Sequence, residues 1–127
     1  MSTVIRNEVS KSNPYYLPKH RYLELKHFCL QYPDWRKEYG AIIFEKDDDF
    51  DPTGKKAVRL KMLTDRMAMV EETAKEVDPV LAEYLFFAVT GDKSYTYLRT
   101  AMNIPCGKNL YYDLYRKFWW LLSKKRE

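Results

Sequence analysis

An aromatic, basic stretch near the end of this chain also contains polar side chains at residues 93–117. These side chains are of the types that contact nucleic acids. Lysine and arginine neutralise phosphates, and arginine also reads guanine through two parallel hydrogen bonds. Asparagine reads adenine through a bidentate pair, whereas hydroxyl side chains donate to phosphate oxygens and set the register. The residues predicted to contact duplex DNA are Lys93, Ser94, Tyr95, Thr96, Arg99, Lys108, Asn109, Tyr112, Arg116 and Lys117.

The distribution of charge along the chain favours the same ligand. The 127 residues carry a net charge of +4. Residues 92–127 hold eight Lys or Arg and three Asp or Glu, which gives +5, whereas residues 40–91 sum to −4. A basic segment on a mixed body is the electrostatic footprint of a nucleic-acid-binding protein, and a solvated basic tail is the simpler alternative.

Catalytic and metal-binding chemistry has little support in the sequence. His20 and His27 are seven residues apart, which is not the spacing of a zinc pair, and no Ser/His/Asp or Cys/His set stands out. An EF-hand loop that starts at Asp47 requires glycine at its sixth position and glutamate at its twelfth, where this chain has Pro52 and Val58. We therefore expect a solvated acidic loop, no enzymatic activity, no metal and no cofactor.

The cysteines and the apolar runs bear on location. Cys29 and Cys106 stand far apart without a CxxC motif, which favours free thiols in a reducing compartment. No run of 18 apolar residues is present, and the first 13 residues lack the apolar core of a signal peptide. The sequence therefore predicts a cytoplasmic protein that does not enter a membrane.

Helical periodicity dominates the chain and predicts an all-α fold, a small helical domain. Residues 1–50 read as an N-terminal helical segment with the acidic loop, and residues 51–127 as a long helix followed by shorter ones. We expect the two parts to form one compact domain. The sequence predicts helices at about residues 20–31, 55–77, 79–89, 94–102 and 108–124, with a short strand or extended segment near residues 41–44.

The long helix carries an apolar seam with alternating spacings of three and four residues, the pattern of a heptad repeat. Such a seam packs against the chain's own helices or pairs with a second copy of the chain, and the sequence leaves both readings open. Its residues are Leu60, Leu63, Met67, Val70 and Ala74.

The last three helices follow the order of a helix-turn-helix unit, with a short helix and a turn before the final one. The apolar side chains of Leu98 and Met102 on the short helix, and of Ile104 in the turn, are expected to point into the core. In this motif the N-terminal residues of the final helix reach base edges. The aromatic residues Tyr111, Tyr115, Phe118 and Trp119 are expected mostly in the core.

Residues 91–122, GDKSYTYLRTAMNIPCGKNLYYDLYRKFWWLL, resemble the region-4 helix-turn-helix of sigma factors. They are also similar to the RinA and ArpU types of late transcription regulator from phages of Gram-positive bacteria, and to uncharacterised prophage proteins of Firmicutes. The turn is longer than in sigma factors, and Asp113 lies on the expected recognition face. The matching positions are Gly91, Ser94, Tyr95, Leu98, Met102, Ile104, Tyr111 or Tyr112, Arg116 and Phe118.

The resemblance implies a phage-type transcription regulator that binds duplex DNA in the cytoplasm of a bacterial host, with a homodimer as one arrangement. A second hypothesis belongs to another class of protein. It is a phage-encoded inhibitor, such as an anti-CRISPR or an RNA polymerase inhibitor, that binds a host nucleic-acid machine as its protein target.

Overall fold

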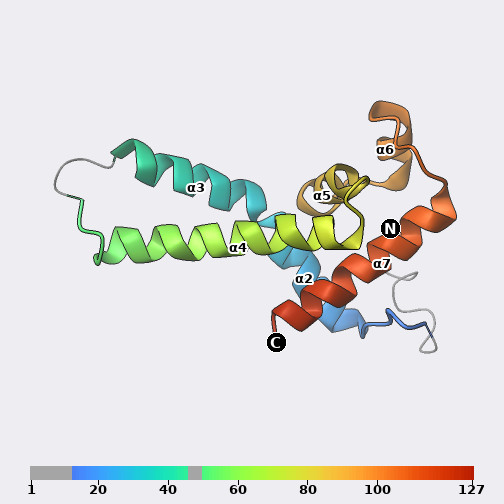
Figure 1. The fold of residues 1–127 in the computed structure, drawn as a ribbon, viewed down its shortest axis with the longest axis horizontal. Coiled ribbons are helices and arrows are strands. Elements are labelled where there is room, and N and C mark those ends of the chain that lie inside the picture. Colours follow the sequence, from blue (N-terminus) through green and yellow to red (C-terminus); the bar gives the residue numbers. More distant parts are fainter. Residues whose placement is uncertain (1–12, 46–49) are drawn as a thin grey trace.

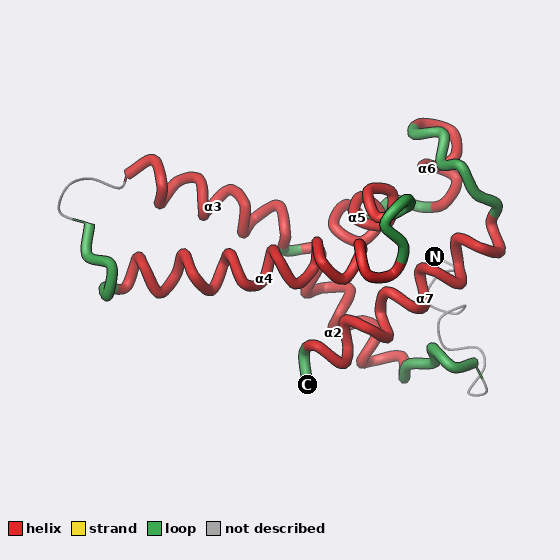
Figure 2. Tube along the Cα trace, viewed as in Figure 1, coloured by secondary structure: helices red, strands yellow, loops and turns green. Residues whose placement is uncertain are grey.

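Helices are the regular elements of the structure, a computed structural model that describes residues 13–45 and 50–127 (Figures 1 and 2). These two ranges contain no strand, so the prediction of an all-α fold is confirmed. The helices are α2 (Lys19–Leu30), α3 (Tyr32–Glu45), α4 (Lys55–Val77), α5 (Ala82–Gly91), α6 (Tyr95–Ala101) and α7 (Lys108–Lys125).

The long helix α4 organises the molecule. Helix α3 runs back along its N-terminal half, and this hairpin extends away from the other helices (Figure 1). Helices α5 and α7 pack on the C-terminal half of α4, and α2 lies against α5 and α7. The short helix α6 therefore lies at the far end of the molecule from the hairpin tip (Figure 1).

The core is centred on the aromatic residues of α7 and α2. Trp119 and Phe118 are fully buried, and the Trp119 ring lies 5.6 Å from the ring of Tyr22. The hydroxyl groups of Tyr22 and Tyr115 hydrogen-bond to each other at 2.8 Å, so both polar ends are satisfied inside the core. Most of the aromatic crowding in the last helix thus serves packing, as the sequence predicted.

Three of the five residues of the predicted seam of α4 are buried inside the protein, whereas Leu60 and Met67 are half-buried. Leu63, Val70 and Ala74 are buried by helices of the same chain, and Met67 is packed against the same core. Of the two readings left open by the sequence, intramolecular packing is the one observed for these residues. The buried positions are not available to a second copy of the chain.

The predicted strand or extended segment near residues 41–44 is wrong, because α3 continues to Glu45. Gly40, a residue type that often ends a helix, also lies within α3. The continuation keeps α3 beside α4, where Ile42 packs against the core and Glu38 accepts a hydrogen bond from Arg59 at 2.7 Å. Tertiary packing therefore outweighs the weak helix propensity of glycine and isoleucine.

The other helix boundaries follow the sequence closely, and α4 begins and ends where it was predicted. The start of α5 is later than expected. Asp78 accepts hydrogen bonds from the backbone N–H groups of Val80 and Leu81, so the cap is present. The chain makes a turn over residues 79–81 before the helix begins at Ala82.

No helix in the described ranges combines the length and apolar character needed to cross a membrane.

The buried tyrosines make alkaline lability an expected property of the fold. Burial raises the pKa of both Tyr111 and Tyr115 above the ordinary value of 10.0. A raised pKa means that their contribution to stability is complete below about pH 10 and is lost as the pH rises through the folded-state values. We expect ultraviolet absorbance to show these two phenols ionising only as the protein unfolds. Their ionisation at the ordinary pKa in a folded protein would contradict the packing described.

Candidate nucleic-acid interface

The connection between α6 and α7 is fixed by hydrogen bonds and by two buried side chains. Asn103 adopts a left-handed φ of 56°, which asparagine tolerates better than most residues. The N–H of Ile104 then donates to the carbonyl of Leu98 at 3.0 Å, and both side chains are buried. The Tyr95 hydroxyl donates to the carbonyl of Cys106 at 2.8 Å. These contacts hold α6 against the start of α7.

Most of the predicted DNA contacts are exposed and belong to one region, formed by α6, the residues just before it and the first turn of α7. Ser94 also caps α6, because its side-chain oxygen accepts a hydrogen bond from the Tyr97 N–H. Its hydroxyl hydrogen is not used in that bond. The exposed members are Lys93, Ser94, Thr96, Arg99, Lys108 and Asn109.

The structure contradicts the prediction that Tyr112 lies on the exposed face of α7. Its side chain is 7% exposed, and its ring lies 5.2 Å from Tyr111 and 6.2 Å from Tyr115. Tyr95 is also half-buried, and its hydroxyl donates within the protein rather than outward. The sequence alone does not show which of two consecutive tyrosines faces the core. Here both Tyr111 and Tyr112 do, because the Tyr95 ring of α6 packs near both.

Arg116 does not present its guanidinium group as predicted. Its side chain is only 17% exposed, Nη2 donates to Asp113 at 2.8 Å, and Nε is buried. A guanidinium held in this way no longer offers a free fork to a base edge. Lys117, one turn further along, is half-buried. Of the predicted DNA contacts on α7, only Lys108 and Asn109, in its first turn, are exposed.

The N-terminus of α7 receives no side-chain cap from the described residues. The residue before the helix is Gly107, and the first intrahelical hydrogen bond runs from the Tyr111 N–H to the Gly107 carbonyl at 3.1 Å. The N–H groups of the three preceding positions, Lys108, Asn109 and Leu110, have no partner within the helix. All three residues are exposed, so backbone donors and the positive end of the helix dipole face the solvent there.

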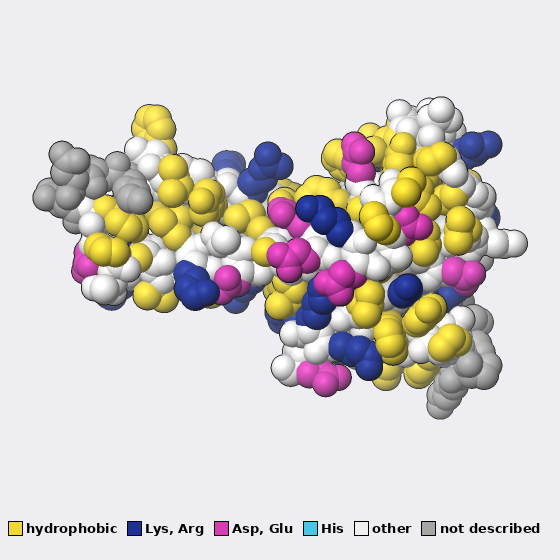
Figure 3. All heavy atoms as spheres, viewed as in Figure 1, with side chains coloured by type: hydrophobic (Ala, Val, Ile, Leu, Met, Phe, Trp, Pro, Cys, Tyr) yellow, Lys and Arg dark blue, Asp and Glu magenta, His cyan; other side chains and the backbone are white. Residues whose placement is uncertain are grey.

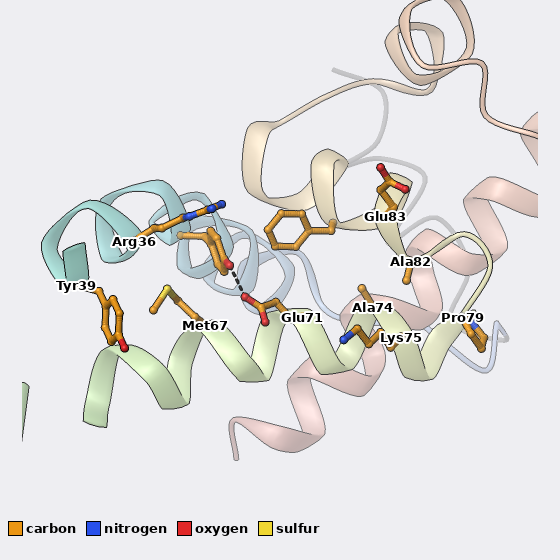
Figure 4. A pocket seen from close by; sticks show the side chains of 11 residues that line it. Arg36, Tyr39, Met67, Glu71, Ala74, Lys75, Pro79, Ala82 and Glu83 are labelled. Atoms are coloured by element: carbon orange, nitrogen blue, oxygen red, sulfur yellow. Dashed lines mark hydrogen bonds between the residues drawn. The ribbon is translucent and has the colours of Figure 1, made fainter. Parts of the chain in front are cut away.

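A second surface feature was not found from the sequence. An open groove of about 820 Å³ lies where α3, α4 and α5 meet (Figure 4). Tyr39, Met67 and Phe86 give it an apolar lining, and Arg36 and Lys75 border it. Figure 3 shows hydrophobic side chains gathered along the junction of α3 and α4 that leads to this groove.

One hydrogen bond organises the floor of this groove. The Tyr32 hydroxyl donates to the Glu71 carboxylate, and burial together with this bond raises the pKa of Tyr32 to about 12. The signal in the sequence was the composition of the α4 seam, where Met67 and Ala74 stand in place of branched aliphatic residues. Small or flexible side chains at seam positions leave room that the neighbouring helices do not fill.

Cys29 and Cys106 are the two cysteine thiols of the chain. Burial, followed by the influence of Asp78, raises the pKa of the Cys106 thiol, which keeps it protonated and a poor nucleophile. Burial has the same effect on the pKa of Cys29. Within the described ranges, no group of three or more His, Cys, Asp or Glu residues is placed to hold a metal ion.

Comparisons with protein families, with curated proteins and with solved structures found no match to this chain.

Replacing Tyr95 with phenylalanine is expected to lower the free energy of unfolding by about 1 kcal/mol, because the Cys106 carbonyl loses its donor. Amide hydrogen exchange should accelerate in the turn at residues 102–107. Tyr97→Phe is the matched control, since Tyr97 is 42% exposed and its ring contacts Lys93 at the surface. Equal effects of the two substitutions would show that the hydrogen bond does not hold the turn.

Proposed function

We propose that this protein binds duplex DNA through the surface formed by Lys93, α6 and the first turn of α7. The observation that carries the proposal is a helix start with free backbone donors, exposed Lys108 and Asn109, and the exposed cations Lys93 and Arg99 beside it. Helix N-termini receive phosphates, and the first turn of a recognition helix reaches base edges.

Each exposed residue then has a physical role. Lys93, Arg99 and Lys108 neutralise phosphates, and the hydroxyl groups of Ser94 and Thr96 donate to phosphate oxygens. Asn109 is the residue suited to read a base, by a bidentate pair with adenine. Tyr112 and Arg116 support this surface from beneath rather than contacting DNA.

A single exposed base-reading residue implies weak sequence preference. Binding of this kind suits a regulator of transcription that recognises its site partly through the shape of the duplex. The resemblance of residues 91–122 to phage transcription regulators points to the same role.

The test is fluorescence anisotropy with labelled duplex DNA at several salt concentrations. Affinity should be highest at low salt and fall linearly on a logarithmic scale as salt rises, because bound phosphates release their counterions. An absence of binding at the lowest salt concentration would refute the proposal.

The groove between α3, α4 and α5 favours a second function, the binding of a host protein. Its apolar lining and mixed charged border suit a partner segment that buries apolar side chains. Such a complex should survive salt concentrations that abolish DNA binding. Met67→Lys should prevent it, whereas Leu110→Lys, on the exposed start of α7, should not. Loss of the complex with Leu110→Lys but not with Met67→Lys would show that a protein partner binds the proposed DNA surface instead.

A further inference from the structure

Two guanidinium groups lie on a pair of packed aromatic rings at the C-terminal end of α7. The Cζ atom of Arg126 is 3.7 Å from the centre of the Phe28 ring, and that of Arg66 is 5.8 Å from the centre of a Trp35 ring. The Phe28 and Trp35 rings are themselves 4.8 Å apart. The two arginines come from α4 and from the residue after α7, and the rings come from α2 and α3.

Neither guanidinium has an anionic partner in the part of the chain that the structure describes. The ion pairs formed there include neither Arg66 nor Arg126, and the Nε atom of Arg126 is buried without a hydrogen-bond acceptor. The aromatic rings make cation–π contacts with the faces of the guanidinium planes and accept none of their N–H donors. The Nη donors at the edges of both guanidinium groups remain available to an acceptor.

A third arginine increases the positive charge of this cluster. Arg21 donates to Ser123 and to Glu24 through all three of its nitrogen atoms. Its charge still acts on Arg126. Burial, followed by the charges of Arg21 and Arg66, lowers the pKa of Arg126, while Glu24 opposes this effect. Of the three arginines, Arg21 alone forms an ion pair among the described residues, with Glu24.

Several carboxylates of the described residues are already paired with other cations. Glu38 binds Arg59, Glu76 binds Lys125 at 2.5 Å, and Glu24 binds Arg21. Arg66 and Arg126, which form no ion pair there and lie on aromatic rings, match an external oxyanion better than an internal ion pair.

We propose that Arg66 and Arg126 form a binding site for a phosphate group, with the charge of Arg21 reinforcing it. The Nη donors of each guanidinium bind the phosphate oxygens, because the Nε atom of Arg126 is buried. The site is at the opposite end of α7 from Lys108 and Asn109, and an 18-residue helix spans about 27 Å. The proposal does not depend on DNA binding at the first turn of α7.

The phosphate group belongs either to a small phosphorylated molecule or to a nucleic-acid backbone, and two arms of one experiment separate these sources. In the first arm, inorganic phosphate is titrated at constant ionic strength while the side-chain Nε–H resonances of the arginines are followed by NMR. In the second arm, a short DNA duplex replaces phosphate. Saturable shifts of the Arg66 and Arg126 resonances with phosphate support a small-molecule site, and shifts with the duplex alone support a backbone site.

Arg66→Gln should weaken the response of Arg126 to the bound group about tenfold, the effect of one charged hydrogen bond. Lys56→Gln removes the same charge from an exposed position of α4 and should leave the response unchanged. The proposal fails if neither phosphate nor duplex shifts these resonances in the unaltered protein, or if Lys56→Gln weakens the response as much as Arg66→Gln. Loss of this site would leave DNA binding at the first turn of α7 intact.

Discussion

Replacing Trp119 with alanine is expected to lower the free energy of unfolding by about 3–5 kcal/mol. The Trp119 side chain is fully buried, and its ring lies 4.8 Å from Phe118, 5.6 Å from Tyr22 and 5.7 Å from Tyr115. Alanine would leave a cavity where α7 and α2 meet. Because small domains are stable by only about 5–15 kcal/mol, a large fraction of the stability would be lost.

The measurement is chemical denaturation followed by circular dichroism. The next residue provides a matched control, since Trp120 is half-buried and contacts Tyr15 and Lys124. Trp120→Ala should cost much less stability than Trp119→Ala, although the chemical change is identical. Equal decreases would mean that the orientation of α7 about its own axis differs from the one described.

Removing the three exposed cations of the DNA surface, by Lys93→Gln, Arg99→Gln and Lys108→Gln together, is expected to weaken DNA binding at least tenfold at low salt. The salt dependence should also become shallower, by about one unit of logarithmic slope for each phosphate that is no longer neutralised. All three residues are exposed and make no ion pair among the described residues, so the fold should be unaffected.

The control carries the same change in net charge at the other end of the molecule. Lys55, Lys56 and Lys61 are exposed residues at the start of α4, near the hairpin tip. Their replacement by glutamine should reduce affinity only slightly, through the overall charge. If this control weakened binding as much as the first variant, DNA would be attracted by net charge alone, without a defined surface.

The elements that the sequence predicted correctly are those with long, regular apolar patterns. The heptad spacing along α4 and the polar residues on either side of it were sufficient to place Lys55–Val77. The strand near residues 41–44 was wrong because a short run of apolar residues fits a buried strand and a buried helix equally well. Only the presence of α4 beside α3 decides between them.

The candidate site was predicted in part. Lys108 and Asn109 follow a turn at the start of a helix, which identifies them as exposed from sequence order alone. Tyr112 and Arg116 were wrongly placed outward, because the orientation of α7 depends on how α6 covers its first two turns. Pairing between Arg116 and Asp113 is local, at a spacing of three residues, and could have been anticipated.

The groove and the arginine cluster could not be predicted from the sequence. Residues of the groove come from α3, α4 and α5, and those of the cluster from α2, α3, α4 and the end of α7. Neither set forms a motif along the chain. Both arise because α4 contacts α3 as well as α5 and α7, which brings distant segments of the chain together.

The most direct test of DNA binding at the first turn of α7 is an NMR titration that follows backbone amide shifts as duplex DNA is added. The account predicts shifts concentrated in residues 93–110, largest at the free N–H groups of Lys108, Asn109 and Leu110. Shifts confined to the α3–α4 hairpin, or none at low salt, would contradict it.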